Sequence, residues 1–597
     1  MLIFRSVQLR LFATSCLATA LISCASGDKG GTTTGTAGTG GNSTAGSAGT
    51  TGSAGTSATG SAGTGQTAGT TGTGGSVTSG AAGTTGTSGT SGSAGSSSTG
   101  TGGSGTSGGA GTTGSGGTTG SGGSSGTGTG GSGSGGAISG LMITANPNSV
   151  ISCYVAWTTA TAANSIVQFG QNGYQWEISD TAQVTSHKVL VIGMHAQQTY
   201  QIKAISGSAS ATGMFTTGTL PAQIPNGKVM INDTTKSQAG WTLMNVQKGQ
   251  GDTRARSDFP PYAVMYDSGG LPVWYYVDGT MPDIGGAVST QLTDKGVMIG
   301  PSWNANLTTG ALPIEVDFAG NTVWQCPASL CGNGKNFTHH ASKLSNGNYG
   351  LIEYIMTGSR QDPIFREVNA SNTVVWSLDY AKLVTPPSGA TGDWCHANSM
   401  TVDIAKNLVY ANCRWAGLLK ATHDATPVRK WLLTGMGKGS SVPTLPTSDI
   451  AFSPASSAFS DTHDPEIHDD GTICFFDNGG YSGGAGGSTT MFHSRAVEYK
   501  IDETAKTATL TWEFPGTATV PDAWYTANWY TPFWGDVDRL PNGNYLVAAG
   551  IRSTTVESRV FEVTSDKKVV WEFRFPPDYG VYRADRITPP LVHAVTN

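Results

Sequence analysis

Long basic runs, membrane-spanning apolar segments and helical periodicity are all missing from this sequence. Its net charge is only −6 and no long basic run occurs, so nucleic acid is not an expected partner. Beyond the first 22 residues, no stretch is long and apolar enough to cross a bilayer. The absence of a CxxC pair argues against a zinc site built from thiolates. Because long helical periodicity is missing as well, we expect an all-β protein.

The N-terminus has the features of a secretory signal. Arg5 and Arg10 supply positive charge, and the apolar run 11–22 that follows is too short for a comfortable membrane span. The run ends in Leu-Ile-Ser-Cys, which resembles a bacterial lipobox. We therefore predict a lipoprotein signal peptide over residues 1–24, with Cys24 as the lipidated first residue of the mature chain. An ordinary signal peptide with an incidental cysteine is the alternative.

Residues 25–138 are predicted to form a disordered linker. The segment consists almost wholly of Gly, Ser, Thr and Ala and has no aromatic residue, so it cannot bury apolar surface. As a flexible coil it would span roughly 60 Å, which would hold a folded body away from a membrane. Ala25 after the cysteine favours the outer membrane. We expect an exported protein anchored there, on the periplasmic side or at the cell surface.

Residues 139–220 are expected to form a small β-sandwich. Four short strand candidates follow one another between turns. They are residues 153–157, 165–169, 188–192 and 198–204. The strands that contain Trp157 and Tyr200 resemble the core strands of a fibronectin type III module. A proline-rich break around Pro221 and Pro225 then marks a domain boundary.

Residues 226–597 repeat loosely in the manner of a β-propeller. A strand that ends in Val-Trp or a similar pair recurs after a polar turn, at intervals of 50 to 81 residues. The tryptophans are Trp274, Trp324, Trp376, Trp431, Trp512 and Trp571. Tight Asn-Gly or Asp-Gly turns alternate with them. Six such units predict a six-bladed β-propeller. An array of β-sandwiches, the alternative, would not explain two interleaved signatures at this period.

Six cysteines lie beyond the predicted signal and anchor, and export would permit disulfides. Cys326 and Cys331 are five positions apart and could close a small loop. Cys395 and Cys413 could form a second bridge if their strands are neighbours. That bridge would brace the histidine and the arginine that directly follow the two cysteines.

Three stretches, far apart in the chain, each deliver a histidine next to a strand of the predicted propeller. They read Thr-His-His-Ala at 338–341, Asp-Trp-Cys-His-Ala-Asn at 393–398 and Asp-Thr-His-Asp at 461–464. Arg414 follows the second stretch. Because every blade of a propeller faces one central channel, these residues can converge. Imidazoles and a guanidinium would make a cationic, donor-rich pocket suited to the transfer of a small tetrahedral oxyanion group.

The region 226–597 resembles the bacterial arylsulfotransferase family, a group of exported six-bladed propellers. The resemblance rests on the second and third histidine stretches, on four further motifs, and on the order of all six along the chain. These motifs are Asn-Cys-Arg at 412–414, Phe-Asp-Asn-Gly at 476–479, Gly-Asp-Val-Asp-Arg-Leu-Pro-Asn-Gly-Asn at 535–544 and Tyr-Arg-Ala-Asp-Arg at 582–586. Family members move a sulfuryl group from a phenolic sulfate to a phenolic acceptor without phosphoadenosine phosphosulfate. The resemblance therefore implies no cofactor and no metal.

The resemblance also implies roles for individual residues. The histidine of the His-Asp stretch, His463, would become transiently sulfated, because a neutral imidazole is a good nucleophile and later a good leaving group. The catalytic positions carry over to His463, His396, Arg414 and His340, and the substrate-binding positions to Asn398, His339 and Thr531. Within the His-His pair, His340 is preferred as the donor to the sulfuryl oxygens and His339 is the alternative.

Two other functions stay open from the residues alone. Imidazoles from His340, His396 and His463 could hold zinc or manganese in a propeller hydrolase or lyase, although a neighbouring guanidinium would repel the metal. A surface-tethered binding protein without catalysis would also carry the long linker. The preferred prediction is an aryl-sulfate sulfotransferase that uses small aromatic sulfates and phenols. Family members with this front domain can pair, so a homodimer is a further expectation.

Overall fold

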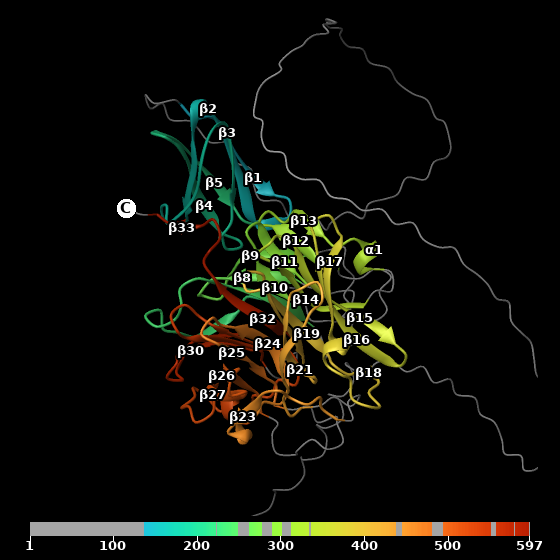
Figure 1. Ribbon diagram of the computed structural model, residues 1–597. Helices are drawn as coiled ribbons and strands as arrows, with labels where there is room; N and C mark the ends of the chain where they lie inside the picture. The colour runs from blue at the N-terminus through green and yellow to red at the C-terminus, as the bar shows by residue number, and fades with distance from the viewer. Residues whose placement is uncertain are drawn as a thin grey trace, which may run out of the picture. The chain divides into compact units, whose positions relative to one another are not determined.

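The computed structural model describes most of the chain beyond residue 136 (Figure 1). The described residues are 137–222, 224–248, 262–277, 289–300, 312–332, 336–437, 444–479, 493–550, 557–577 and 579–595. The predicted signal peptide with its Cys24, and the predicted linker up to residue 136, lie outside them. Within the described ranges, no helix is long and apolar enough to cross a membrane.

An antiparallel sheet forms the first part of the described chain. Its strands are β1 (Ser139–Asn146), β2 (Ser149–Gly170), β3 (Trp176–Val191), β4 (Thr199–Ser206), β5 (Ala209–Thr216) and, from the far end of the chain, β33 (His593–Ala594). They pair in the order β33-β3-β2-β4-β5, with β1 also paired to β2 (Figure 1). The two short strands predicted at 153–157 and 165–169 are both parts of the 22-residue strand β2.

This sheet folds over on itself around an apolar core. Strand β1 contacts β5, so the two ends of the sheet face each other as in a small β-sandwich. In β4 every second residue is buried, which is the period that a sheet with one solvated face requires. Trp157 lies in this core together with Phe169 and Phe215.

Six further antiparallel sheets, each with four main strands, follow along the chain. The first contains β10 (Thr290–Leu292), β11 (Gly296–Ile299), β12 (Ile314–Asp317) and β13 (Thr322–Gln325). The second contains β14 (Asn336–Lys343), β15 (Tyr349–Thr357), β16 (Arg360–Val368) and β17 (Val374–Asp379), with β18 (Gly392–Asp393) added. The third contains β19 (Ala397–Asp403), β20 (Leu408–Cys413), β21 (Gly417–Thr422) and β22 (Arg429–Leu433). Two four-residue helices, α1 (Ala328–Cys331) and α2 (Tyr380–Leu383), lie in the connections.

The last three sheets use both ends of this region. The fourth contains β24 (Thr462–Ile467), β25 (Thr472–Asp477), β26 (Arg495–Asp502) and β27 (Thr507–Phe514), with β23 (Ala451–Ser453) added. The fifth contains β28 (Asp536–Arg539), β29 (Tyr545–Ala549), β30 (Arg559–Val563) and β31 (Val569–Arg574), joined by β6 (Lys228–Asn232). The sixth joins β32 (Tyr579–Ile587) to β7 (Trp241–Lys248), β8 (Tyr262–Tyr266) and β9 (Pro272–Val277).

The first strands of the six sheets form a closed ring. Strand β10 contacts β14, β14 contacts β19, β19 contacts β24, β24 contacts β28, β28 contacts β32, and β32 contacts β10. The sixth sheet combines a C-terminal strand with three N-terminal ones, so the chain itself closes the ring. The prediction of an all-β protein with a six-bladed propeller is therefore confirmed, and the six sheets are its blades.

The recurring tryptophans join each blade to the next. Each lies on the fourth strand of its blade. In five of the six, the indole Nε1–H donates to the turn between the third and fourth strands of the following blade. The observed bonds run from Trp274 to Phe318 O, Trp324 to Asn372 Oδ1, Trp376 to Asp424 O, Trp512 to Ser565 O and Trp571 to Ser268 O, at 2.8 to 3.2 Å. Trp431 lines a small cavity with Glu503 of the next blade, and its Nε1–H has no hydrogen-bond partner among the described residues.

The predicted tight turns are also present. Gly347, Gly471 and Gly543 join the first and second strands of the second, fourth and fifth blades, with φ of 86°, 79° and 84°. Only glycine adopts this left-handed backbone without a steric cost. The Asn-Gly and Asp-Gly pairs in the sequence therefore fix the hairpins that surround the channel.

We predict that Trp571→Phe destabilises the protein by about 0.5–1.5 kcal/mol, because the phenyl ring still packs while the partly buried hydrogen bond from the indole to the Ser268 carbonyl of the sixth blade is lost. Urea unfolding measures this free energy. The matched control is Trp176→Phe, since Trp176 is 43% exposed on β3. Equal effects of the two substitutions would contradict a special role for the indole contact.

Candidate active site

The three histidine stretches lie on or beside the innermost strands of three consecutive blades. His339 and His340 lie on β14, His396 directly precedes β19, and His463 lies on β24. In each blade the ladder to the second strand is irregular at this point: between Phe337 and Ala341, between Ala397 and Ser399, and between His463 and Glu466. Such bulges re-aim side chains and are common beside active sites.

Positive φ angles accompany these irregularities. His339 has φ 54°, His396 has φ 54°, and Asp464 has φ 45°. Left-handed backbone is unusual for residues other than glycine and is kept only where the surrounding structure enforces it. A bulge with left-handed backbone therefore occurs in three blades, at His339 and His396 and directly after His463.

The imidazole of His463 is fixed in one tautomer by a neighbouring amide. Its Nδ1 lies 2.6 Å from Asn478 Oδ1. The Nδ2 of Asn478 donates to the carbonyls of Thr531, at 2.9 Å, and Trp534, at 2.7 Å. Because both amide hydrogens have acceptors, the Oδ1 side must face the imidazole and accept its Nδ1–H. The lone pair of His463 therefore lies on Nε2, which accepts only a long 3.3 Å bond from the Trp534 backbone N–H.

His463 is held neutral by its surroundings. The residue is 1% exposed. Burial lowers the pKa of His463 well below its ordinary value, and the nearby charges of Arg414, His396 and His339 lower it further. An unprotonated ring at neutral pH is the form that can act as a nucleophile.

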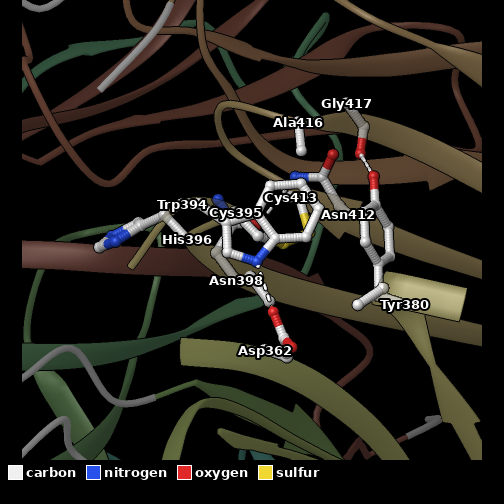
Figure 2. Close-up of a disulfide and its surroundings, with 12 residues drawn as sticks. Asp362, Tyr380, Trp394, Cys395, His396, Asn398, Asn412, Cys413, Ala416 and Gly417 are labelled. Atoms are coloured by element: carbon white, nitrogen blue, oxygen red, sulfur yellow. Dashed lines mark hydrogen bonds between the residues drawn. A yellow bond between two sulfur atoms is a disulfide. The ribbon is translucent and has the colours of Figure 1, made fainter. Parts of the chain in front are cut away.

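His396 is oriented by Asp393 and by a disulfide. Its Nδ1 lies 2.6 Å from Asp393 Oδ2. Burial raises the pKa of Asp393, but the charge and hydrogen bonds of His396 outweigh it, so that pKa stays below its ordinary value. The predicted Cys395–Cys413 bridge is present, and Figure 2 shows His396 pointing away from it. The predicted Cys326–Cys331 bridge is present too.

Arg414 is brought beside His396 by the same bridge. Its backbone N–H donates to His396 O at 3.0 Å. Its buried guanidinium donates to Asp461 Oδ2, from Nη2 at 3.0 Å and from Nε at 3.3 Å, and to the carbonyl of Pro532. Burial raises the pKa of Asp461 despite this partner. The guanidinium is thus clamped between the fourth blade and the segment that leads to the fifth.

The His-His pair divides between two sides of β14. The ring of His339 lies 4.9 Å from that of His396, centre to centre, and 6.3 Å from that of Tyr582. Tyr582 also contacts His463, at 6.0 Å. His339, the alternative member of the pair, thus joins the cluster, because the bulge and the positive φ turn its ring toward His396; the preferred His340 lies on the other side of the strand.

His340 faces a separate acidic cavity. Its Nδ1 lies 3.2 Å from Arg583 Nη1, and burial and this guanidinium lower the pKa of His340 well below its ordinary value. The cavity, of about 360 Å³, is also lined by Asp464, Asp538 and Asp585. Burial and the neighbouring carboxylates raise the pKa of Asp585 to about 7.

Asn398 and Thr531 form hydrogen bonds that support the site. Asn398 Nδ2 donates to Thr462 O at 2.8 Å, and its Oδ1 accepts from Asn412 Nδ2 at 2.7 Å. These bonds hold the backbone next to His463. The carbonyl of Thr531 accepts from Asn478, and its buried hydroxyl has no hydrogen-bond partner among the described residues.

Several residues of this cluster were not singled out from the sequence. Asn478 and Tyr582 occur in motifs that carried the resemblance, and Asp393 opens the second histidine stretch. Asp461 opens the third. A signal therefore existed for each, but their roles depend on contacts between blades that no local pattern reveals.

The described residues do not support a three-histidine metal site. A metal site needs at least three ligand atoms close together. Among the described residues, neither His340, His396 nor His463 has two other His, Cys, Asp or Glu side chains whose ligand atoms lie within 4.8 Å of it and of each other. His463 Nδ1 is also occupied by Asn478. The metal-dependent hydrolase is thus the weaker alternative on geometric grounds.

The family model described as arylsulfotransferase (ASST) matches residues 227–583. The chain belongs to the arylsulfotransferase family. The match runs from just before β6 into β32 and includes every residue of the histidine cluster described above, so arylsulfotransferase activity is supported in general terms. No curated protein matches the sequence significantly.

Solved structures show only distant similarity to this arylsulfotransferase family member. A mutant of the Synechocystis apocarotenoid oxygenase is 8% identical, with 61% of this chain and 95% of that chain covered and a TM-score of 0.30. The dihydro-heme d1 dehydrogenase NirN, in complex with DHE, is 8% identical, with 62% and 84% covered and a TM-score of 0.31. Neither similarity bears on the chemistry of the site.

We predict that Asn478→Ala releases the tautomer of His463, because the acceptor for its Nδ1–H is lost. In ¹⁵N-histidine spectra, the native protein should show the Nδ1–H form and the variant a mixture. Asn346→Ala, which removes an amide from a turn in the second blade, is the control. An Nε2–H form in the native protein would contradict the assignment.

The same spectra test the pKa of His463. In the folded protein its ring should stay unprotonated below the ordinary histidine pKa of about 6.5, whereas in urea it should titrate near that value. Because the folded pKa is the lower one, this residue makes stability fall as pH decreases through about 6.5. A ring that titrates alike in both states would contradict the burial argument.

Proposed function

We propose that the protein transfers a sulfuryl group from a phenolic sulfate ester to a phenolic acceptor through a covalent intermediate on His463 Nε2. The observation that supports this most directly is the Asn478 contact, which leaves the lone pair of a buried, neutral imidazole on Nε2. A nucleophile of this kind allows one difficult displacement to be divided into two easier ones.

In the first step Nε2 attacks the sulfur, the N–S bond forms, and the S–O bond to the donor phenol breaks. The phenolate leaves with the electron pair of that bond and takes a proton from a nearby acid. In the second step the acceptor phenol gives its proton to the same group, which is now a base, its oxygen attacks the sulfur, and the S–N bond breaks with its electron pair returning to Nε2. His463 then returns to its neutral form, so the cycle is balanced and requires no cofactor.

The hydrogen-bond donors around His463 suit the charge that develops on the sulfuryl oxygens. Arg414 and His396 both lie in the third blade, and their partners Asp461 and Asp393 hold them in place. His339 contacts His396 from the preceding blade. Donors fixed before the reaction begins are typically worth about 3–4 kcal/mol each in the transition state. The His396–Asp393 pair is suited to deliver a proton to the leaving phenolate.

We predict that His463→Ala abolishes nitrophenolate release from p-nitrophenyl sulfate and a phenol, by about 10³-fold or more, because no other group can form the intermediate. His339→Ala should cost about 10²–10³-fold, as the loss of one donor. His340→Ala is the matched control and should keep most of the activity, because its ring faces the acidic cavity.

Trapping the intermediate separates this function from its alternatives. Rapid mixing with the aryl sulfate, followed by peptide mass spectrometry, should find one sulfuryl group on the peptide that contains His463. Full activity in His463→Ala would reject the mechanism. Failure to form sulfohistidine with any aryl sulfate, together with retained ligand binding, would favour a non-catalytic binding protein.

The membrane anchor is a further part of the proposal. It rests on the lipobox-like ending before Cys24 and on the long linker that follows. The enzyme would then act on small aromatic sulfates and phenols outside the cytoplasm, where its two disulfides can form. Recovery of a Cys24→Ser variant in the membrane fraction, at the native level, would reject lipidation at this residue.

A further inference from the structure

A second cluster of reactive side chains lies on the hairpin that carries His463. It consists of Glu466, His468 and Cys474, from β24, the following turn and β25. His468 Nε2 lies 3.3 Å from Cys474 Sγ, Cys474 Sγ lies 3.3 Å from Glu466 Oε2, and His468 Nε2 lies 3.4 Å from Glu466 Oε2. Three different ligand types therefore form a nearly equilateral triangle.

The triangle has the dimensions of one face of a zinc coordination tetrahedron. With Zn–S of about 2.3 Å and Zn–N or Zn–O of about 2.0–2.1 Å, tetrahedral angles place neighbouring ligand atoms about 3.3–3.6 Å apart. Thiolate, imidazole and carboxylate together suit Zn²⁺ better than the hard cations Mg²⁺ and Ca²⁺. We infer that Glu466, His468 and Cys474 bind a zinc ion, with a water molecule or a neighbouring group as fourth ligand.

The surroundings of the triangle suit a cation. The thiol is fully buried, while the side chains of His468 and Glu466 are 10% and 38% exposed, which leaves a route for the ion on the carboxylate side. Glu466 also lines the acidic cavity, together with Asp538. The backbone N–H of Arg539 donates to Glu466 Oε2 at 2.7 Å and orients the carboxylate. Outer partners of this kind hold metal ligands in place.

Zinc binding would replace one proton of the apo protein. In the apo form the Cys474 thiol is within reach of two acceptors, Glu466 Oε2 and the carbonyl of Val537. Burial raises the pKa of this thiol well above its ordinary value, and the nearby carboxylates raise it further. When zinc binds, the S–H bond breaks, the S–Zn bond forms and the proton leaves to solvent.

The position of the triangle gives the ion a structural role. The ladder between β24 and β25 is broken between His463 and Glu466. Strand β24 carries His463, and Asn478 directly follows β25. A zinc ion on Glu466 and Cys474 would fasten the two strands just beyond the break and so hold His463 against Asn478. Such a site was not predicted from the sequence, because the ligands come from one hairpin rather than from a CxxC pair.

The test uses the whole protein, freed of metal with a chelator and then titrated with Zn²⁺ or Co²⁺ in the absence of reducing thiols. We expect one equivalent of zinc per chain by elemental analysis, and with Co²⁺ the near-ultraviolet band of a cobalt–thiolate bond. Cys474→Ala should abolish that band. Cys153→Ala is the matched control, because Cys153 is the other buried free thiol among the described residues and lies in an apolar core.

A second variant keeps the proposal testable if Cys474→Ala fails to fold. Glu466→Gln retains an acceptor for the Arg539 N–H but loses the charge, so it should lower zinc affinity by at least about tenfold, since even outer-shell partners of metal sites are worth that much. Absence of a cobalt–thiolate band in the native protein, or a band that survives in Cys474→Ala, would overturn the proposal. So would an equal loss of the band in Cys153→Ala.

Discussion

The indole contacts between neighbouring blades are the interaction on which the rest of the structure depends. Each blade alone is a small twisted sheet that cannot bury both of its faces. In most blades the tryptophan on the fourth strand donates a hydrogen bond to a turn of the next blade. The bond from Trp571 to the carbonyl of Ser268 links the fifth blade to the sixth, which contains both early and late strands of the chain. Because the circle is complete, the innermost strands are held at fixed positions around one channel.

That rigidity allows the inner strands to carry strained backbone. Bulges and positive φ angles at His339, His396 and Asp464 aim side chains from three blades at one another. Amides and carboxylates then fix each functional group: Asn478 sets the tautomer of His463, and Asp393 orients His396. The reactive imidazole is thus a product of contacts between blades, and the arylsulfotransferase chemistry proposed for it rests on this preorganisation.

Repetition made the fold predictable, whereas single side chains were harder to place. Trp324 and its equivalents recur because each performs the same task in its blade, so counting them predicted six blades correctly. His463 and His396 could be predicted as site residues because each stands in a distinctive short motif. The choice between His339 and His340 could not be made from the sequence, because adjacent residues of a regular strand face opposite sides and only the bulge decides which side is inward. Asn398 has a framework role that depends on Thr462, a residue from another blade.

The sixth blade has a consequence for biosynthesis. Its strands β7 to β9 emerge from the ribosome before the main strands of the other five blades, but their partner β32 emerges only after all of them. Strand β32 also carries Tyr582 and Arg583, which contact His463 and His340. A nascent chain therefore has neither a closed ring nor a complete catalytic centre until β32 has been made. Truncated products would be left with open sheet edges, which cellular quality control can recognise as unfinished.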